Sequence, residues 1–228
     1  MFGWGRPKRP KVVAFDAIGT MFPLDPLRPS LMALGLPWAG LESWYATTLR
    51  DALALTASGD FKPFAVVMAS ALDQVLGEQG LAPPRAARQA LLAQFKHLPA
   101  RPDARTALQL AARARMRAIL LTNGNEAGTR SLLQQAGLDK LVERVVSVED
   151  IGLFKPRPEV YAHAAWRCRV RLNRMALVAV HPWDINGAKA ARCIGAYVTA
   201  DRPFASTMRA PDLQAPSLAA AVAALAAL

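Results

Sequence analysis

Short apolar runs and helical patterns alternate along the second half of the chain. Each run is followed by a segment whose apolar residues recur every three or four positions, which is typical of a strand followed by an amphipathic helix. The predicted strands span residues 11–15, 118–122, 144–148, 175–180 and 196–200, and the predicted helices span 102–116, 126–136, 158–168 and 186–193. This alternation predicts an α/β fold with a Rossmann-like parallel sheet flanked by helices. The alanine-rich end "SLAAAVAALAAL" predicts a final packing helix.

The segment between the first two predicted strands shows helical spacing only. Two sets of residues there each share one helical face: Leu41, Trp44, Tyr45, Thr48, Ala52 and Leu55 in the first, and Phe64, Val67, Met68, Ala71, Leu72, Val75 and Leu76 in the second. The stretches "SGDFKPF" and "QGLAPP" separate the helices. We therefore expect an inserted helical cap domain at residues 25–101, and a core domain made of residues 1–24 and 102–228.

The composition is that of a chain that buries a large core without crossing a membrane. Its 228 residues are 53% hydrophobic. No apolar run reaches the roughly 18 residues that span a bilayer. The first residues, "MFGWGRPKRPK", lack the apolar stretch of a signal peptide, so we expect a cytoplasmic protein with no membrane partner. Cys168 and Cys193 are too few for a disulfide framework and are expected to be reduced thiols.

The charge of the chain bears on its partners. A formal net charge of +11 favours anionic small molecules as ligands. The basic residues are scattered except for a group at residues 6–11 and the group Arg113, Arg115 and Arg117, and no aromatic residues that could stack on bases are interleaved with them. We therefore expect a small anionic organic substrate and no nucleic-acid partner.

Four polar clusters follow predicted strands. They are Asp16 with Thr20, the segment 122–125 ("TNGN"), Lys155, and the segment 181–184 ("HPWD"). Each cluster alone is also explained by a turn, a solvated side chain or a helix cap, as for Asp184 ahead of Ile185. Together they supply two carboxylates, a cation, and hydroxyl and amide donors. Because the carboxyl ends of parallel strands converge, the four clusters predict one ligand site at that edge of the sheet.

The order of these motifs carries a family resemblance. The segments "FDAIGT", "LLTNGN", "GLFKPRPEVY" and "VHPWDINGAKAA" resemble the haloacid dehalogenase superfamily over nearly the whole chain, and the first and last are most similar to its (S)-2-haloacid dehalogenase branch. The resemblance implies a hydrolase with an aspartyl nucleophile that releases halide from a small 2-haloalkanoic acid through an aspartyl ester. The alternatives are a Mg-dependent phosphatase of the superfamily and a non-catalytic binding protein with the same fold.

Two positions argue against the phosphatase. Superfamily phosphatases carry a general acid two residues after the nucleophile, where this chain has Ile18, and a magnesium-binding aspartate where it has Ala179. A halide leaves without a proton and without a metal, so both replacements are compatible with dehalogenation. We expect no metal and no cofactor.

The resemblance implies a role for each cluster. Asp16 is the expected nucleophile, Lys155 the cation that keeps it ionised and pairs with the substrate carboxylate, and Asp184 the group that orients or deprotonates water. The expected substrate contacts are the backbone amides of the turn at Ala17 and Ile18, the side chain of Thr20, Thr122, Asn123, a pocket tyrosine at Tyr161, His181, and an aromatic wall at Trp183. Packing is the alternative for both Tyr161 and Trp183. His181 can orient water, hold a departing anion or make a structural hydrogen bond.

Two departures from the family bear on the substrate. The family's arginine early in the cap has no match, because no Arg or Lys occurs between Arg28 and Arg50, and Arg28 is the candidate to replace it. The serine and asparagine that the family has ahead of "WD" are Ala179 and His181 here. The apolar faces of the cap make a homodimer one expected assembly.

Overall fold

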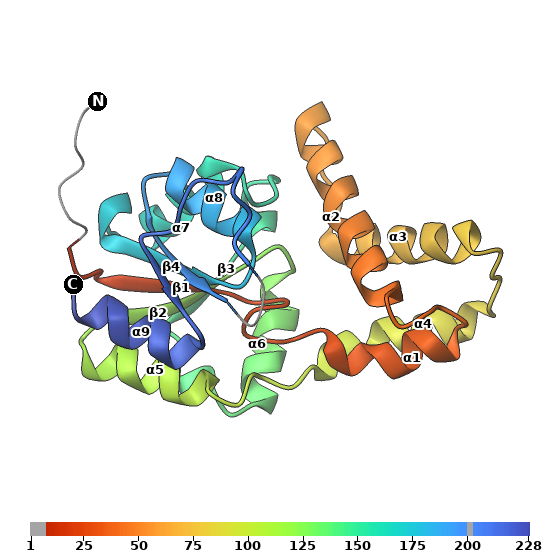
Figure 1. The fold of residues 1–228 in the computed structure, drawn as a ribbon, viewed down its shortest axis with the longest axis horizontal. Helices are drawn as coiled ribbons and strands as arrows, with labels where there is room; N and C mark the ends of the chain where they lie inside the picture. Colours follow the sequence, from red (N-terminus) through yellow and green to blue (C-terminus); the bar gives the residue numbers. More distant parts are fainter. Residues whose placement is uncertain (1–7, 200–202) are drawn as a thin grey trace.

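The core of the protein is built on one parallel sheet (Figure 1). The computed structural model describes residues 8–199 and 203–228, and within them the sheet has six strands: β1 Val12–Asp16, β2 Arg117–Thr122, β3 Arg144–Ser147, β4 Met175–Ala179, β5 Ile194–Val198 and β6 Leu213–Ala215. The order β3-β2-β1-β4-β5-β6 puts β1 in the middle, and the strand order reverses between β1 and β4. Ligands bind at such a reversal point in open α/β sheets. The predicted α/β fold is confirmed.

Helices cover both faces of this sheet (Figure 1). Helices α5 (Ala104–Arg113), α6 (Glu126–Gln135) and α9 (Leu218–Ala226) lie on one face, and α7 (Pro158–Arg167) and α8 (Pro182–Ala190) lie on the other. The short 3-10 helices Asp139–Leu141, Val148–Asp150 and Leu172–Arg174 lie in the connections. Because both faces are covered, the strands are continuous apolar runs, and Val12 to Phe15 are fully buried.

Most predicted elements of the core are confirmed, with two differences. The helix predicted at 186–193 begins earlier, at Pro182, because a proline suits the first helical position and His181 takes the cap position. Asp184 therefore lies in the first turn of α8 and is not its N-cap. Strand β6 was not predicted, because three residues at a sheet edge carry too little periodicity to be recognised. The strand predicted at 196–200 is β5, and residue 200 lies outside the described residues.

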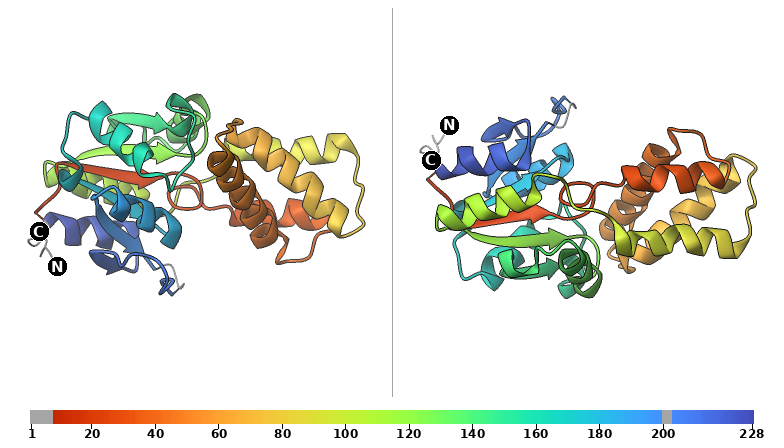
Figure 2. Two further views of the ribbon diagram at one scale, coloured as in Figure 1. Left: turned by 90° about the horizontal axis from the view of Figure 1, so that it is seen from above. Right: turned by 90° about the horizontal axis from the view of Figure 1, so that it is seen from below.

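A group of helices lies beside the core, between β1 and α5 in sequence (Figure 2). It contains α1 (Arg28–Ala33), α2 (Gly40–Ser58), α3 (Phe64–Glu78) and α4 (Arg85–Ala93), with short 3-10 helices at Asp25–Leu27 and Gln94–His97. All seven predicted residues of the α3 face are buried. On α2, Trp44 is buried as predicted, whereas Tyr45 is only half-buried and borders a cavity between the two groups. The domain boundaries at 25 and 101 stay a prediction.

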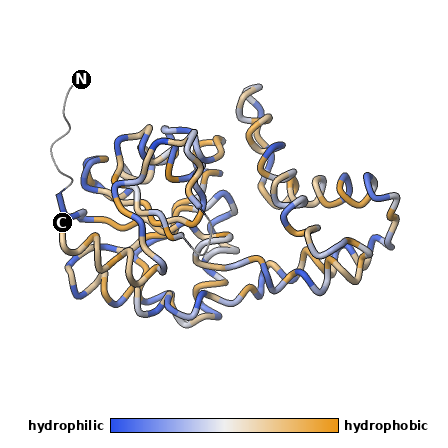
Figure 3. The backbone as a smooth tube through the Cα atoms, in the orientation of Figure 1, coloured by the Kyte–Doolittle hydropathy of each residue, from blue (hydrophilic) through white to orange (hydrophobic). Residues whose placement is uncertain are grey.

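Hydropathy follows this architecture. The strands form a hydrophobic centre in the core, and polar positions lie mainly on the outer sides of the helices (Figure 3). No helix in the described part of the chain is long and apolar enough to cross a membrane.

Substitution of Gly187 tests how closely α8 packs below the site. A Cβ at Gly187 would lie 2.5 Å from the Pro156 carbonyl oxygen and 2.5 Å from the Tyr161 hydroxyl, whereas a Cβ at Gly77 on α3 would meet nothing within 4 Å. Replacing Gly77 by Ala should raise the free energy of unfolding by about 0.5–1 kcal/mol, because alanine favours the helix. Replacing Gly187 by Ala should lower it by about 1–3 kcal/mol, because the clash outweighs that gain. Urea unfolding of both variants measures the difference, and an equally stabilised Gly187→Ala protein would contradict the packing described.

Candidate active site

Asp16 is the last residue of the central strand and lies at the carboxyl edge of the sheet. The chain turns sharply after it, since the amide of Met21 donates to the Asp16 carbonyl oxygen at 3.1 Å. Gly19 in this turn has a φ of +86°, and a Cβ there would lie 2.7 Å from Cε1 of His181. Position 19 therefore requires glycine for two reasons, the backbone conformation and the close approach of the imidazole.

Three side chains hydrogen-bond to the Asp16 carboxylate. Lys155 Nζ lies 2.6 Å from Oδ1, while the Thr20 hydroxyl at 2.6 Å and His181 Nδ1 at 3.0 Å both contact Oδ2. Burial alone would raise the pKa of Asp16, but the charge of Lys155 and the hydrogen bond from His181 outweigh it and hold the pKa well below its usual range. Asp16 is therefore an anion, held in one orientation and only 3% exposed.

Lys155 is buried between two carboxylates. Its ammonium group donates to Asp16 at 2.6 Å, to Oδ2 of Asp184 at 2.8 Å and to the Leu121 carbonyl oxygen at 3.1 Å. Burial would lower the pKa of Lys155, but the two carboxylates raise it above its ordinary value. An ammonium group has three N–H donors, and all three are used. The expectation that Lys155 also pairs with the substrate carboxylate is therefore not supported by this geometry.

Asp184 lies behind Lys155 and has no exposed surface. Its Oδ2 accepts from Lys155, and its Oδ1 accepts from the Tyr161 hydroxyl at 2.5 Å. Burial raises the pKa of Tyr161 well above its ordinary value, so the phenol stays protonated and donates. Burial also raises the pKa of Asp184, although Lys155 opposes it. Of the two expectations for Tyr161, a pocket tyrosine or a packed residue with a hydrogen-bonded hydroxyl, the structure agrees with the second: Tyr161 is buried where α7 and α8 pack, and its hydroxyl orients the Asp184 carboxylate.

Thr122, Asn123 and the turn after Asp16 form the second part of the site. The Thr122 hydroxyl accepts from the Gly124 amide at 3.0 Å, and the Asn123 side-chain oxygen accepts from the Lys155 amide at 3.1 Å. The amides of Ile18 and Asn123 donate no hydrogen bond among the turn and loop contacts of the described residues. They are candidates for the amide cradle expected from the sequence.

His181 is held between two aromatic rings. The Trp183 ring stacks on it with centroids 5.1 Å apart, and the Tyr45 ring from α2 lies 5.7 Å away on a tilt. His181 is 8% exposed. Of the three side chains bonded to Asp16, it is the one that borders the cavity between core and cap. Tyr45 was predicted only as part of the cap's own core, because its helical position gives no sign of a neighbour from the other domain.

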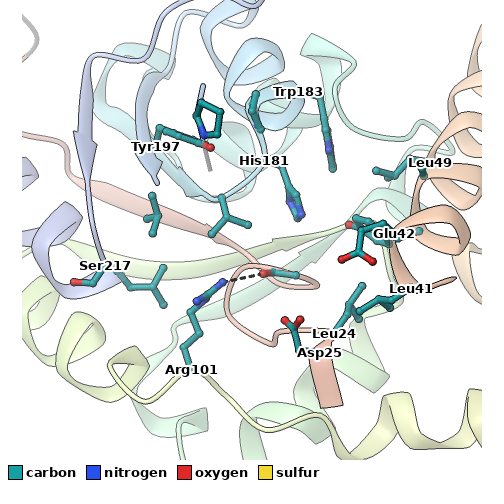
Figure 4. Close-up of a pocket in the computed structure, with 18 of the residues that line it drawn as sticks. Leu24, Asp25, Leu41, Glu42, Leu49, Arg101, His181, Trp183, Tyr197 and Ser217 are labelled. Carbon is teal, nitrogen blue, oxygen red and sulfur yellow. Dashed lines mark hydrogen bonds between the residues drawn. The ribbon is translucent and has the colours of Figure 1, made fainter. Parts of the chain in front are cut away.

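The cavity has a volume of about 700 Å³ and is lined from both sides (Figure 4). Leu41, Glu42 and Leu49 come from α2, whereas His181, Trp183 and Arg101 come from the core side and the return connection. Trp183 borders this cavity, as expected for an aromatic wall.

Arg28, the sequence-based candidate for the missing cap cation, is already neutralised. Its guanidinium donates to the carboxylates of Asp25 and Glu42 and, at 2.9 Å, to the Trp38 carbonyl oxygen. Its side chain is almost fully buried by these contacts. The expectation that Arg28 replaces the family's arginine is therefore not supported. Sequence reasoning missed Arg101, which follows the cap helices and belongs to no motif.

The residues at the site do not fit Mg²⁺. Both oxygens of Asp184 are engaged by Lys155 and Tyr161, and positions 18 and 179 offer Ile and Ala side chains without an oxygen. Within the described ranges, no group of three or more His, Cys, Asp or Glu side chains is arranged to hold a metal ion. Mg²⁺ needs several hard oxygen ligands, which these side chains do not provide.

The chain belongs to the haloacid dehalogenase-like hydrolases, because the model of that family matches residues 10–192. It is 30% identical over 182 residues to (S)-2-haloacid dehalogenase 1 of Pseudomonas sp. (strain CBS-3), covering 79% of this chain and 80% of that protein. It is 26% identical over 186 residues to (S)-2-haloacid dehalogenase 4A of Burkholderia cepacia, covering 78% of each. The resemblance found in the motifs is confirmed.

Solved structures show the same fold. The L-2-haloacid dehalogenase of Xanthobacter autotrophicus with chloropropionic acid covalently bound superposes with a TM-score of 0.82 at 24% identity, over 92% of this chain and 95% of that one. Another L-2-haloacid dehalogenase superposes with a TM-score of 0.91 at 22% identity, over 96% and 99% of the two chains.

Replacing Lys155 by Met tests the buried ion cluster. Two buried carboxylates would then lack their cation, so the free energy of unfolding should fall by about 3–5 kcal/mol. The added change Asp184→Asn should recover part of this loss, because it removes one of the two charges.

In the wild type, the lowered pKa of Asp16 stabilises the fold down to strongly acidic pH. In Lys155→Met, burial without the cation raises the pKa of Asp16, so the variant loses stability as the pH rises. The difference in the free energy of unfolding between the wild type and Lys155→Met should therefore grow between about pH 5 and pH 8. Denaturant unfolding at both pH values checks this, and a pH-independent loss would contradict it.

Proposed function

We propose that the protein is an (S)-2-haloacid dehalogenase that hydrolyses a small 2-haloalkanoic acid to a 2-hydroxy acid and halide. The observation that carries the proposal is Asp16, a carboxylate held ionised by Lys155 beside a cavity, with no acid two residues further along. Relatives named (S)-2-haloacid dehalogenases match 78% and 79% of this chain, which supports the same substrate class here.

In the first step, the Asp16 carboxylate attacks the carbon that bears the halogen. A carbon–oxygen bond forms as the carbon–halogen bond breaks, and the halide leaves with the bonding electrons. A halide needs no proton, which agrees with Ile18 at the position of the phosphatases' acid. The amides of Ile18 and Asn123, with Thr122, are suited to hold the oxyanion that forms on the Asp16 ester in the second step.

In the second step, water attacks the carbonyl carbon of the Asp16 ester. In the resting site, His181 Nδ1 donates to the ionised Asp16 carboxylate. The Asp16 ester carries no charge. When the imidazole hydrogen is on Nε2, Nδ1 presents its lone pair to the water that attacks this ester. His181 takes one proton of the attacking water, the ester bond breaks, and the leaving 2-hydroxy acid takes that proton. The other proton of the water passes to solvent as Asp16 returns to its carboxylate. Asp184 was expected in this role from the sequence, but both its oxygens are engaged, so we assign it to the positioning of Lys155.

The covalent route can be tested by isotope transfer. With enzyme in excess over (S)-2-chloropropionate in water labelled with heavy oxygen, the product hydroxyl should be unlabelled, and the peptide that contains Asp16 should gain the label. Mass spectrometry of product and peptide measures both, and Asp16→Asn is the inactive control. Label in the product alone would mean direct attack by water.

The metal requirement is a separate test. Activity should survive EDTA, and stimulation by Mg²⁺ beyond about tenfold would favour the phosphatase alternative.

Measurements of the second step test whether His181 or Asp184 is the base that activates the water. In His181→Asn the amide can donate to Asp16 but cannot accept a proton, so halide should appear in a burst while hydrolysis of the ester slows by roughly 10²–10⁴-fold. In Asp184→Asn the burst itself should slow, because Lys155 loses an anchor. Rapid-quench halide assays and the mass of the Asp16 peptide distinguish the two. His163→Asn, a residue beside Asp150, is the matched control. A trapped ester in Asp184→Asn but not in His181→Asn would return the base to Asp184.

Four further expectations complete the proposal. The substrate is a small organic anion, in line with the names of the relatives. A cytoplasmic location, a homodimer and the absence of a nucleic-acid partner stay predictions from the sequence.

A further inference from the structure

An anionic substrate meets an electrostatic difficulty in this site. The nucleophile is itself an anion, and Asp184 lies close behind it on the same ammonium group. The cavity in front carries three more acidic residues, Asp25, Glu42 and Asp103. Like charges a few ångströms apart repel one another strongly where water is scarce. A substrate carboxylate therefore needs a cation in the cavity that these acids have not already neutralised.

The two most obvious cations do not meet this need. Lys155 uses all three of its N–H donors on Asp16, Asp184 and a carbonyl oxygen, and it does not border the cavity. Arg28 does border the cavity, but its guanidinium is bound to the carboxylates of Asp25 and Glu42. Among the described residues that line the cavity, the other cation is Arg101.

Arg101 is held firmly next to the turn that follows the nucleophile. Its backbone amide donates to the Met21 carbonyl oxygen at 2.9 Å, and its Nε donates to the Thr20 carbonyl oxygen at 2.7 Å. The contact from its Nη2 to the Gly19 carbonyl oxygen is long, at 3.4 Å (Figure 4). Within the described ranges, no carboxylate oxygen lies within 4.0 Å of this guanidinium. A guanidinium has five N–H donors, so three remain for a ligand.

We propose that Arg101 binds the carboxylate of the substrate and supplies the positive charge that the cap of this protein lacks. The assignment rests on the proposed function for the identity of that carboxylate. The planar guanidinium can donate two parallel hydrogen bonds to a carboxylate, which fixes the substrate in orientation as well as in place. Because Arg101 also donates to Thr20, the anion is held on the same turn that presents Asp16.

The test compares an acid with its neutral amide. For Arg101→Met, kcat/KM for (S)-2-bromopropionate should fall by about 10²-fold or more, whereas kcat/KM for (S)-2-bromopropionamide should change by less than about threefold. Arg101→Lys should recover about tenfold of the loss, because it restores the charge without the planar pair of donors. Arg50→Met removes an arginine on α2 that contacts Asp51 and Gln74, and it should leave kcat/KM for both substrates unchanged.

A binding measurement keeps the result independent of turnover. Calorimetry should show propionate binding to the wild type and to Arg50→Met. The affinity of Arg101→Met for propionate should be lower by a factor of at least about ten. Equal losses for the acid and the amide would overturn the proposal and leave Arg101 as a brace of the turn. Unchanged rates would also overturn it. If the wild type released no halide but Arg101→Met still lost propionate binding, the proposed reaction would be wrong and the carboxylate subsite would stand.

Discussion

The ammonium group of Lys155 joins the parts of the site that the chain keeps far apart. It contacts Asp16 at the end of β1, the carbonyl oxygen of Leu121 on β2, and Asp184 in the first turn of α8. Burying one cation with two carboxylates costs a large desolvation energy, which only close contacts and full hydrogen bonding offset. The mutual positions of three elements thus depend on a single group, which also helps to keep Asp16 ionised.

A second layer of contacts keeps this cluster in place. Tyr161 on α7 orients Asp184 from below, and Gly187 of α8 packs so closely against the Tyr161 hydroxyl that no side chain fits there. On the cavity side, Trp183 and Tyr45 hold the imidazole of His181 against Asp16. Buried polar networks are stable when each member is satisfied, and the orientation of each group here is fixed by its neighbours.

The charges of the site are balanced by the protein's own side chains. The ammonium group of Lys155 lies between the carboxylates of Asp16 and Asp184, and positions 18 and 179 add no further acid. An alkyl halide releases its leaving group without a proton or a Lewis acid, whereas a phosphate ester needs charge neutralisation on its oxygens. The same fold thereby favours carbon–halogen hydrolysis over phosphoryl transfer. The anion of the substrate is left to a residue outside the buried cluster, and Arg101 has the free donors for it.

The sequence by itself determined the sheet, the inserted helices and the strand ends at which the polar groups lie. Apolar runs and helical spacing are local properties of the chain, and the carboxyl ends of parallel strands converge whatever the loops do. The motif residues Asp16, Lys155 and Asp184 could therefore be placed in one site before any contact was known. The tertiary structure alone decided which partners each one has. Whether Lys155 has a donor left, whether Tyr161 faces the cavity or a carboxylate, and whether Arg28 or Arg101 keeps a free charge all depend on residues distant in sequence, because hydrogen bonds and ion pairs are settled by the three-dimensional neighbours that compete for the same donors.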